Sequence, residues 1–254
     1  MSKNVSVLWT GGWDSTFRLV ELSFEDVDVY PVYVVDPARK SNGLEQAQMK
    51  RIIAALEGKP LTKARFHDVE TIPLDTIPQD EEITEAFKTI HAKTHLGKQH
   101  EWLARLGKIR PGMEMGTEAG NVATSHILYS IQEFGKLVIG DDGIGALDPQ
   151  LSSREGMLVL GWFRFPIITR TENDMLALIK QWGYEDVMQN IWFCHTPVNG
   201  SPCGICHACA VKMESNMTFL LPKKAQRKYK FFHTYCRIFG NFGKRHVEKL
   251  IKRI

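Results

Sequence analysis

The stretch that decides the fold is WTGGWDST at residues 9–16. Apolar and β-favouring residues at 4–9 precede it and predict a buried first strand. An apolar helical face follows it, made of Phe17, Leu19, Val20 and Leu22. This order brings the N-terminus of a helix to the end of a strand, and we expect Asp14 or Ser15 to cap that helix.

The turn has the composition of an anion-binding site. Gly11 and Gly12 allow the backbone to bend tightly and to approach a ligand closely. Thr10, Ser15 and Thr16 add hydroxyl groups, and the helix N-terminus adds unpaired N–H groups and the positive end of its dipole. The turn lacks the spacing and the lysine of a Walker loop, and it is not G-x-G-x-x-G. An ordinary strand–turn–helix corner, in which the glycines only relieve strain, is the alternative.

The composition is that of a soluble globular protein with one large domain or two small ones. The chain has 254 residues, of which 43% are hydrophobic and 24% charged. No apolar run reaches the ~18–20 residues that a membrane-spanning helix needs. Residues 1–4 lead directly into the first strand, so we expect no signal peptide and a cytoplasmic location. In that compartment five cysteines are expected to be reduced, metal-bound or catalytic.

Strand-like and helix-like segments alternate along the chain. Strands are expected at 28–35, 63–69, 136–140 and 165–168. Helices are expected at 43–56, within 80–134 (including one at 114–134) and, capped by Thr171, at 172–181. The alternation predicts an α/β fold with a Rossmann-like parallel sheet, whose ligands bind beyond the carboxyl ends of the strands. Residues 10–15, 36–40 and 141–142 fall at those ends, and residues 143–161 are expected to form a lid.

A second motif has the spacing C-x8-C-x2-C-x2-C and consists of Cys194, Cys203, Cys206 and Cys209. Four thiolates favour a tetrahedral, closed and therefore structural Zn²⁺ site. A four-iron cluster, or thiols without a metal, are the alternatives. We expect His195 and His207 to lie outside the ligand set and Cys236 to serve packing.

Together the two motifs resemble the 7-cyano-7-deazaguanine synthase (QueC) family of PP-loop ATP pyrophosphatases, whose S-G-G-x-D-S signature has serine where this chain has Thr10. The similarity extends over about residues 5–213. It implies a PP-loop (adenine nucleotide alpha hydrolase) fold with a small zinc lobe. We therefore expect an ATP pyrophosphatase domain at 1–190, a four-cysteine zinc lobe at 191–221 and a basic, aromatic and helical extension at 222–254.

The resemblance also implies a reaction. Members of the family usually form homodimers, use MgATP to adenylate the carboxylate of 7-carboxy-7-deazaguanine, and convert it with ammonia to an amide and then a nitrile, in queuosine biosynthesis. The chain departs from the family at 111–114 and 141–154, two stretches that help to shape the deazaguanine pocket. Some QueC-like proteins of bacterial antiviral operons are thought to stop at the amide and to use another amine, and a protein amine is one such acceptor.

Individual roles follow from this reading. The nucleotide is expected to contact Thr10, Gly11, Gly12, Asp14, Ser15 and Thr16, with Asp36 near its ribose or adenine. The catalytic candidates are Asp14 and Asp141, which would hold Mg²⁺ or its waters, together with Ser15. Arg154 and Lys40 are candidates for binding phosphate or carboxylate. For these acidic and basic residues, capping, turn formation and solvated surface are the alternative roles. His91, His95 and His100 are candidates for a metal site, with a polar helix face as the alternative.

The C-terminal extension is strongly basic. Residues 222–254 contain eleven Lys or Arg and one Glu, a net charge of +10, whereas the preceding residues have a net charge of −7. Six aromatic residues are interleaved between 229 and 242. This composition favours docking on a protein, with nucleic acid or a membrane surface as alternatives. A tRNA-modifying PP-loop enzyme and a non-catalytic nucleotide- or partner-binding protein are the alternative functions.

Overall fold

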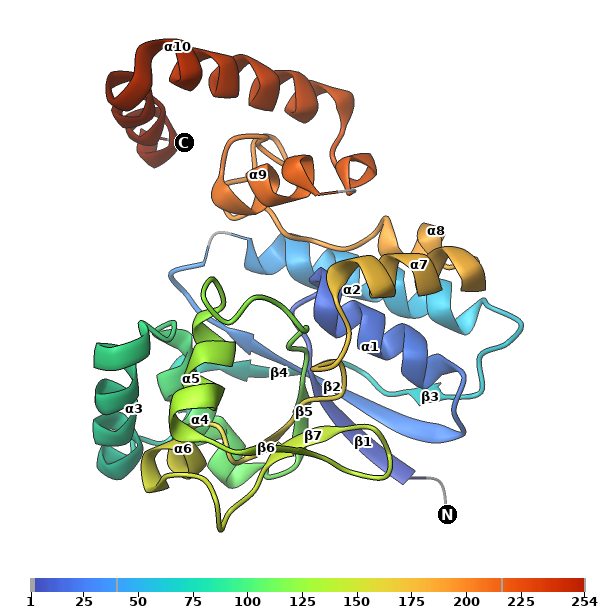
Figure 1. Ribbon diagram of the computed structural model, residues 1–254. Helices are drawn as coiled ribbons and strands as arrows, with labels where there is room; N and C mark the ends of the chain where they lie inside the picture. The colour runs from blue at the N-terminus through green and yellow to red at the C-terminus, as the bar shows by residue number, and fades with distance from the viewer. Residues whose placement is uncertain (1–2, 40, 216, 254) are drawn as a thin grey trace.

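The computed structural model describes residues 3–39, 41–215 and 217–253, with side chains up to Gly240. Its centre is a parallel sheet with the order β3-β2-β1-β5-β8, in which β4 also pairs with β2 (Figure 1). The strands are β1 (Lys3–Leu8), β2 (Val27–Val35), β3 (Arg65–Phe66), β4 (Glu70–Pro73), β5 (Met113–Met115) and β8 (Phe163–Arg164). This architecture confirms the mixed α/β fold and is consistent with a Rossmann-like sheet.

Helices cover both faces of the sheet (Figure 1). One face is covered by α1 (Trp13–Ser23), α2 (Asn42–Glu57), α7 (Glu172–Trp182) and α8 (Glu185–Met188). The other is covered by α3 (Glu81–Thr94), α4 (Gln99–Ile109), α5 (His126–Phe134) and α6 (Arg154–Val159), after the short 3-10 helix η1 (Leu74–Thr76). The predicted apolar face of α1 is confirmed, because Phe17, Leu19, Val20 and Leu22 are fully buried in the first of these two cores.

The helix caps agree with the sequence at one site and differ at another. Thr171 caps α7 through a capping box with Asp174, as predicted. The predicted cap of α1 is wrong: Gly12 is the N-cap residue, so Asp14 and Ser15 lie inside the first turn, and no side chain caps this end. The first turn of α1 therefore keeps its N–H groups for a partner other than a cap.

The predicted strand at 136–140 does not belong to the central sheet. It forms β6 (Leu137–Ile139), which pairs antiparallel with β7 (Gly145–Leu147) in a separate hairpin. Val138 and Ile139 are 41% and 47% exposed, so the apolar run lies at the surface. Asp141 consequently lies in an exposed hairpin turn and not at the carboxyl end of a parallel strand.

The predicted helix at 114–134 is wrong in its first half. Residues Met113–Met115 form β5, which pairs with β1 on one side and β8 on the other, and α5 begins only at His126. Glu114 is buried in this strand and receives two bonds from Arg18 of α1, with Nε–Oε2 at 2.7 Å and Nη2–Oε1 at 3.1 Å. This buried ion pair joins α1 to the strand.

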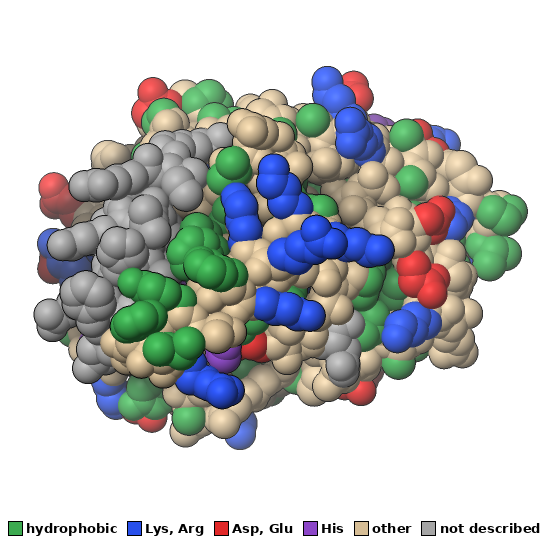
Figure 2. All heavy atoms as spheres, turned by 90° about the horizontal axis from the view of Figure 1, so that it is seen from above, with side chains coloured by type: hydrophobic (Ala, Val, Ile, Leu, Met, Phe, Trp, Pro, Cys, Tyr) green, Lys and Arg blue, Asp and Glu red, His purple; other side chains and the backbone are tan. Residues whose placement is uncertain are grey.

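The C-terminal part of the chain packs around the four cysteines. It comprises α9 (His207–Glu214), the 3-10 helix η2 (Thr218–Leu220) and α10 (Lys223–Arg253), which bends at Gly240, where φ is +52°. Seen from the α10 side, Figure 2 shows a group of Lys and Arg side chains beside a group of hydrophobic ones. In the part of the chain that the structure describes, no helix combines the length and the apolar character that crossing a bilayer requires.

Among the side chains of α10 that the structure describes, up to Gly240, those at its start are anchored in this packing. Ala225 is 2% exposed, and Gln226 donates from Nε2 to the carbonyls of Thr218 and Leu221 at 3.0 and 2.8 Å. Further along, Phe231, Ile238 and Phe239 are largely exposed. The first turns of α10 therefore stabilise the fold, and the exposed side chains of Phe231, Ile238 and Phe239 form a surface.

Truncation at two positions tests this division. A chain that ends at Lys230 keeps the anchoring contacts and is expected to unfold at nearly the same temperature as the full chain. A chain that ends at Pro222 loses them, at a cost of about 1–2 kcal/mol, which lowers the melting temperature by roughly 2–8 °C. Calorimetry of both chains measures the difference, and equal melting temperatures would contradict the anchoring role.

Candidate functional site

A large cavity lies at the carboxyl edge of the sheet, where the strand order changes direction at β1. It has a volume of about 810 Å³. Its walls include the ends of β1 and β2, at Leu8 and Val34, and the end of β5, at Met115. Parallel α/β sheets bind their ligands at such a switch point, because the loops of neighbouring strands separate there. The fold alone therefore marks this cavity as the candidate site.

The glycine turn forms one wall of the cavity. Thr10, Gly12, Asp14 and Ser15 line it. Gly11, with φ +70°, does not line the cavity. Its carbonyl accepts the N–H of Trp192 at 2.8 Å. These four residues and the uncapped first turn of α1 present hydroxyl and N–H groups to the same space.

Two other predicted nucleotide contacts differ in position. Thr16 is fully buried, and its Oγ1 accepts Trp9 Nε1 at 3.0 Å, so it holds the turn from behind and does not line the cavity. Asp36, at the end of β2, does line it. Its Oδ1 accepts the N–H of Ala38 at 2.9 Å, so one carboxylate oxygen shapes the turn.

The loop after β5 supplies residues that the sequence did not reveal. A Cβ on Gly116 would lie 2.9 Å from the backbone nitrogen of Ser15, so only glycine allows this loop to pack against the start of α1. Thr117 and Glu118 follow and line the cavity. The expectation of a helix at 114–134 concealed Glu118, since a strand of three residues has little periodicity to detect.

Asp14 and Glu118 form a half-buried acidic pair in this wall. Burial raises the pKa of Asp14 to about 6, with Lys212 opposing the shift and Glu172 adding to it. Burial, Asp14 and Glu172 raise the pKa of Glu118 to about 7. Oε2 of Glu118 has no hydrogen-bond partner among the described residues. Two carboxylates in this setting favour either protons or a cation.

Lys212 of α9 offsets part of this negative charge. It pairs with Glu172 in the first turn of α7, contacts Sδ of Met217 at 3.2 Å and lies over the ring of Trp13 at 5.6 Å. The cation that faces Asp14 thus comes from the cysteine-containing segment and not from the sheet domain.

The opposite wall is formed by the starts of α4 and α5. Lys98, His100 and Trp102 line it at α4, and Ser125 and Ile127 line it at α5. The exposed His195 adds a contribution from the residue after Cys194. This part of the cavity combines cationic, aromatic and apolar groups and contrasts with the acidic wall.

The remaining predicted ligands do not reach the cavity. Asp141 lies in the β6–β7 turn, and Arg154 pairs with Glu82 on the α3 side; neither lines the cavity. Lys40 lies outside the described residues. The lid expected at 143–161 is wrong, because α6 packs against α3, α4 and α5 and Gly156 lies against the Phe134 carbonyl.

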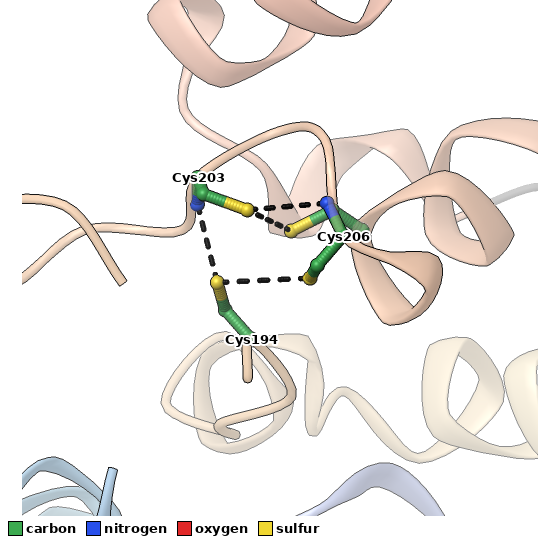
Figure 3. A group of neighbouring side chains, drawn as sticks. Cys194, Cys203 and Cys206 are labelled. Atoms are coloured by element: carbon green, nitrogen blue, oxygen red, sulfur yellow. Dashed lines mark hydrogen bonds between the residues drawn. The ribbon is translucent and has the colours of Figure 1, made fainter. Parts of the chain in front are cut away.

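The four predicted cysteines meet in one buried cluster (Figure 3). Their sulfur atoms all lie within 4.8 Å of one another, and the Cys203–Cys209 and Cys194–Cys206 Sγ–Sγ distances are both 3.9 Å. A tetrahedral ion with bonds of about 2.3 Å separates its sulfur ligands by roughly 3.8 Å. The cluster is therefore positioned to hold one metal ion and is compatible with zinc.

Backbone N–H groups support the sulfur atoms. Cys206 N donates to Cys203 Sγ at 3.2 Å, Ile205 N donates to the same atom at 3.4 Å, and Cys203 N donates to Cys194 Sγ at 3.2 Å. Gly204, at φ +78°, makes the turn that aims these groups. Hydrogen bonds, first from Cys194, lower the pKa of Cys203 to about 6.

The other candidate ligands lie outside this cluster. His207 is exposed, and neither it nor His195 belongs to the ligand set, as expected. Nδ1 of His91 bonds to the Leu96 carbonyl, and His95 ends α3 with a positive φ. Among the described residues no second metal-ligating group includes His91, His95 or His100.

Comparisons with known proteins add no assignment. No family model matches the chain, and no curated protein sequence is significantly similar to it.

Removal of one thiol tests the metal cluster. Cys206→Ala is expected to lose the metal and to lower the free energy of unfolding by more than about 3 kcal/mol, because metal binding contributes to folding. Elemental analysis and calorimetry measure both effects. Cys236→Ala is the matched control, since Cys236 lies in α10 outside the cluster. One metal per chain and an unchanged melting temperature in Cys206→Ala would refute the assignment.

The raised pKa of Glu118 predicts a pH-dependent stability. The pKa of this carboxyl is about 7 in the folded chain and near 4.5 when unfolded, so folding disfavours its ionised form. The penalty is absent below pH 4.5 and complete above pH 7. In buffer without Mg²⁺, Glu118→Gln is expected to stabilise the protein at pH 8 by about 1 kcal/mol, allowing for partial exposure, and not at pH 4.5. Urea unfolding at both pH values measures it, and an equal effect at both would contradict the burial argument.

Proposed function

We propose that this protein is an ATP-dependent, AMP-forming ligase. It would adenylate a 7-carboxy-7-deazaguanine-like carboxylate, release pyrophosphate and transfer the acyl group to an amine. The observation that carries the proposal is the uncapped N-terminus of α1, with Thr10, Gly12 and Ser15 beside it, at the switch point of a parallel sheet.

The cavity suits a nucleotide and a second molecule. Its volume of about 810 Å³ lies in the upper part of the range for small-molecule sites, about 300–1,000 Å³. The pyrophosphate end of ATP fits the start of α1, where N–H groups and the helix dipole favour an anion. Asp36 lies at the end of the neighbouring strand β2, where an acidic residue can bond a ribose hydroxyl.

The acidic wall supports a role for Mg²⁺. Asp14 and Glu118 would repel a triphosphate, and their oxygen atoms are the ligand type that Mg²⁺ prefers. The free Oε2 of Glu118 is consistent with that role. When bound, Mg²⁺ would neutralise charge on the phosphate oxygens as a Lewis acid.

The chain's own groups then have defined tasks. The N–H groups of Trp13, Asp14 and Ser15 would hold the phosphates while a substrate carboxylate oxygen attacks the α-phosphorus and pyrophosphate leaves. Gly116 keeps the loop after β5 against this turn, so that Glu118 would face the same phosphates. The amine would then attack the acyl carbon, and AMP would leave with the electron pair of the broken C–O bond. Both steps depend on positioning and on exclusion of water.

The proposed substrate and the proposed metal of the cysteine cluster are supported by different observations. The deazaguanine acid comes from the QueC resemblance, and the acceptor is ammonia or another amine, a protein amine included. Zinc is proposed for the cysteine cluster because four thiolates in a compact buried set favour a closed structural site. Assembly as a homodimer and a cytoplasmic location are proposed with the family.

A tRNA-modifying PP-loop enzyme is the second candidate, favoured by one observation on α10. Residues 223–240 contain six Lys or Arg and no Asp or Glu. None of these six forms an ion pair with another described residue. Exposed Phe231 and Phe239 lie on the same helix, and cations with aromatic rings suit single-stranded RNA. Modification of a tRNA transcript in place of a free acid would select this candidate.

The nucleotide chemistry is tested at Asp14. Asp14→Asn keeps the size of the side chain and removes the charge that would hold Mg²⁺. We expect pyrophosphate release from ATP, Mg²⁺ and 7-carboxy-7-deazaguanine to fall by at least about 100-fold with the fold intact. Asp141→Asn is the matched control, because Asp141 is exposed in the β6–β7 turn, and it is expected to keep full activity.

Three results would overturn or redirect the proposal. Full turnover in Asp14→Asn removes Asp14 from the mechanism. Loss of turnover in Asp141→Asn would return that residue to the site. ATP binding by the wild type without pyrophosphate release would indicate a nucleotide-binding protein without this activity.

A further inference from the structure

One histidine in the cavity wall is held in a single tautomer. His100 lies in the first turn of α4 and is 8% exposed, and it lines the cavity with Lys98 and Trp102. Its Nδ1 lies 3.0 Å from the Gly97 carbonyl oxygen. A carbonyl oxygen only accepts hydrogen bonds, so Nδ1 carries the proton in this contact and the lone pair of the neutral ring is on Nε2.

Nε2 is available to a ligand. Within the described chain, Nε2 of His100 makes no hydrogen bond. It is also not one of the fully buried polar atoms that lack a partner, so it is accessible. Burial lowers the pKa of His100, and the Gly97 bond only partly offsets this. The ring is therefore neutral near pH 7, with a basic nitrogen in a cavity wall.

The other histidines nearby do not share this combination. His91 and His126 also bond a backbone carbonyl through Nδ1, at 2.6 Å to Leu96 and 2.9 Å to Thr94, but neither lines the cavity. His195 lines it but is exposed. Among the described histidines, His100 alone combines a fixed tautomer, burial and access to the cavity.

The proposed reaction needs such a group at one step. A neutral amine that attacks an acyl-adenylate becomes positively charged on nitrogen as the N–C bond forms, and it must lose a proton before AMP leaves. Neither acid of the opposite wall suits this step, because Asp14 and Glu118 are committed to the phosphate side. A base with a pKa near or below neutral, positioned away from the phosphates, fits the requirement.

We infer that the α4 wall of the cavity is the subsite for the acceptor amine and that Nε2 of His100 takes its proton. This inference rests on the proposed ligase function. In the step, the amine nitrogen bonds to the acyl carbon, its proton passes to Nε2, and the C–O bond breaks with its electron pair leaving on AMP. The imidazolium then returns the proton to water.

Three neighbouring residues define the class of amine. The Lys98 cation lines the same wall and has no ion-pair partner in the described structure, so it disfavours an ammonium ion and favours the neutral amine. Trp102 and Ile127 give the wall an apolar side. The subsite therefore suits a primary amine on an uncharged or apolar body more than a polycation.

The test separates adenylation from amide formation. ATP–pyrophosphate exchange with 7-carboxy-7-deazaguanine measures the first, and amide formed from methylamine measures the second. In His100→Ala we expect exchange within about 3-fold of the wild type and amide formation lowered by about 10²–10⁴-fold. Added imidazole is expected to restore part of the amide formation, which a purely structural role would not allow. His100→Gln, which keeps the volume but not the base, is expected to resemble His100→Ala without rescue.

His91→Ala is the matched control, because His91 makes the same type of Nδ1 bond outside the cavity, and both rates are expected to stay unchanged. Equal amide formation in His100→Ala and the wild type would overturn the assignment of His100, as would a parallel loss of both activities without imidazole rescue. Absence of exchange in the wild type would overturn the ligase proposal itself, so the two failures are distinguishable.

Discussion

The close approach of the loop after β5 to the start of α1 is the constraint on which the site depends. Gly116 packs against the backbone of Ser15, where any Cβ would collide, and the buried Arg18–Glu114 pair holds the same helix to the same strand. One contact is steric and the other electrostatic, and both fix α1 relative to β5. Without them the glycine turn and Glu118 would not face a common space.

This arrangement places groups with opposing electrostatic effects in one cavity. The first turn of α1 offers N–H groups that attract anions, yet Asp14 and Glu118 place negative charge beside it, at a cost seen in their raised pKa values. Groups held at such a cost are typical of functional sites. The α4 wall, with Lys98 and His100, has the opposite character, so the two parts of the cavity suit ligand groups of different charge.

The sequence predicted the features that depend on local chemistry. The glycine turn, the apolar face of α1, the Thr171 cap and the cysteine spacing all follow from residues close together in the chain. The failures concern tertiary context. Met113–Met115 is too short to show the alternation of a strand. Its central residue, Glu114, is charged and suggests an exposed position, whereas the structure buries it in an ion pair with Arg18. The run at Leu137–Ile139 reads as a buried strand, whereas its pairing with β7 leaves it at the surface. Glu118 was hidden because its place depends on the non-local pairing of β5, and the place of His100 in the cavity wall was not predicted.

The position of Lys212 links the metal cluster to the charge balance of the cavity. α9 begins just after Cys206, contains Cys209 and, three residues later, Lys212, which pairs with Glu172. Loss of a metal ion held by the four cysteines would loosen this helix and withdraw the cation that lowers the pKa of both Asp14 and Glu118. The three carboxylates would then repel one another, and proton uptake would relieve the repulsion. Loss of the metal would in this way change the protonation of the carboxylates beside the glycine turn, at a distance from the sulfur atoms.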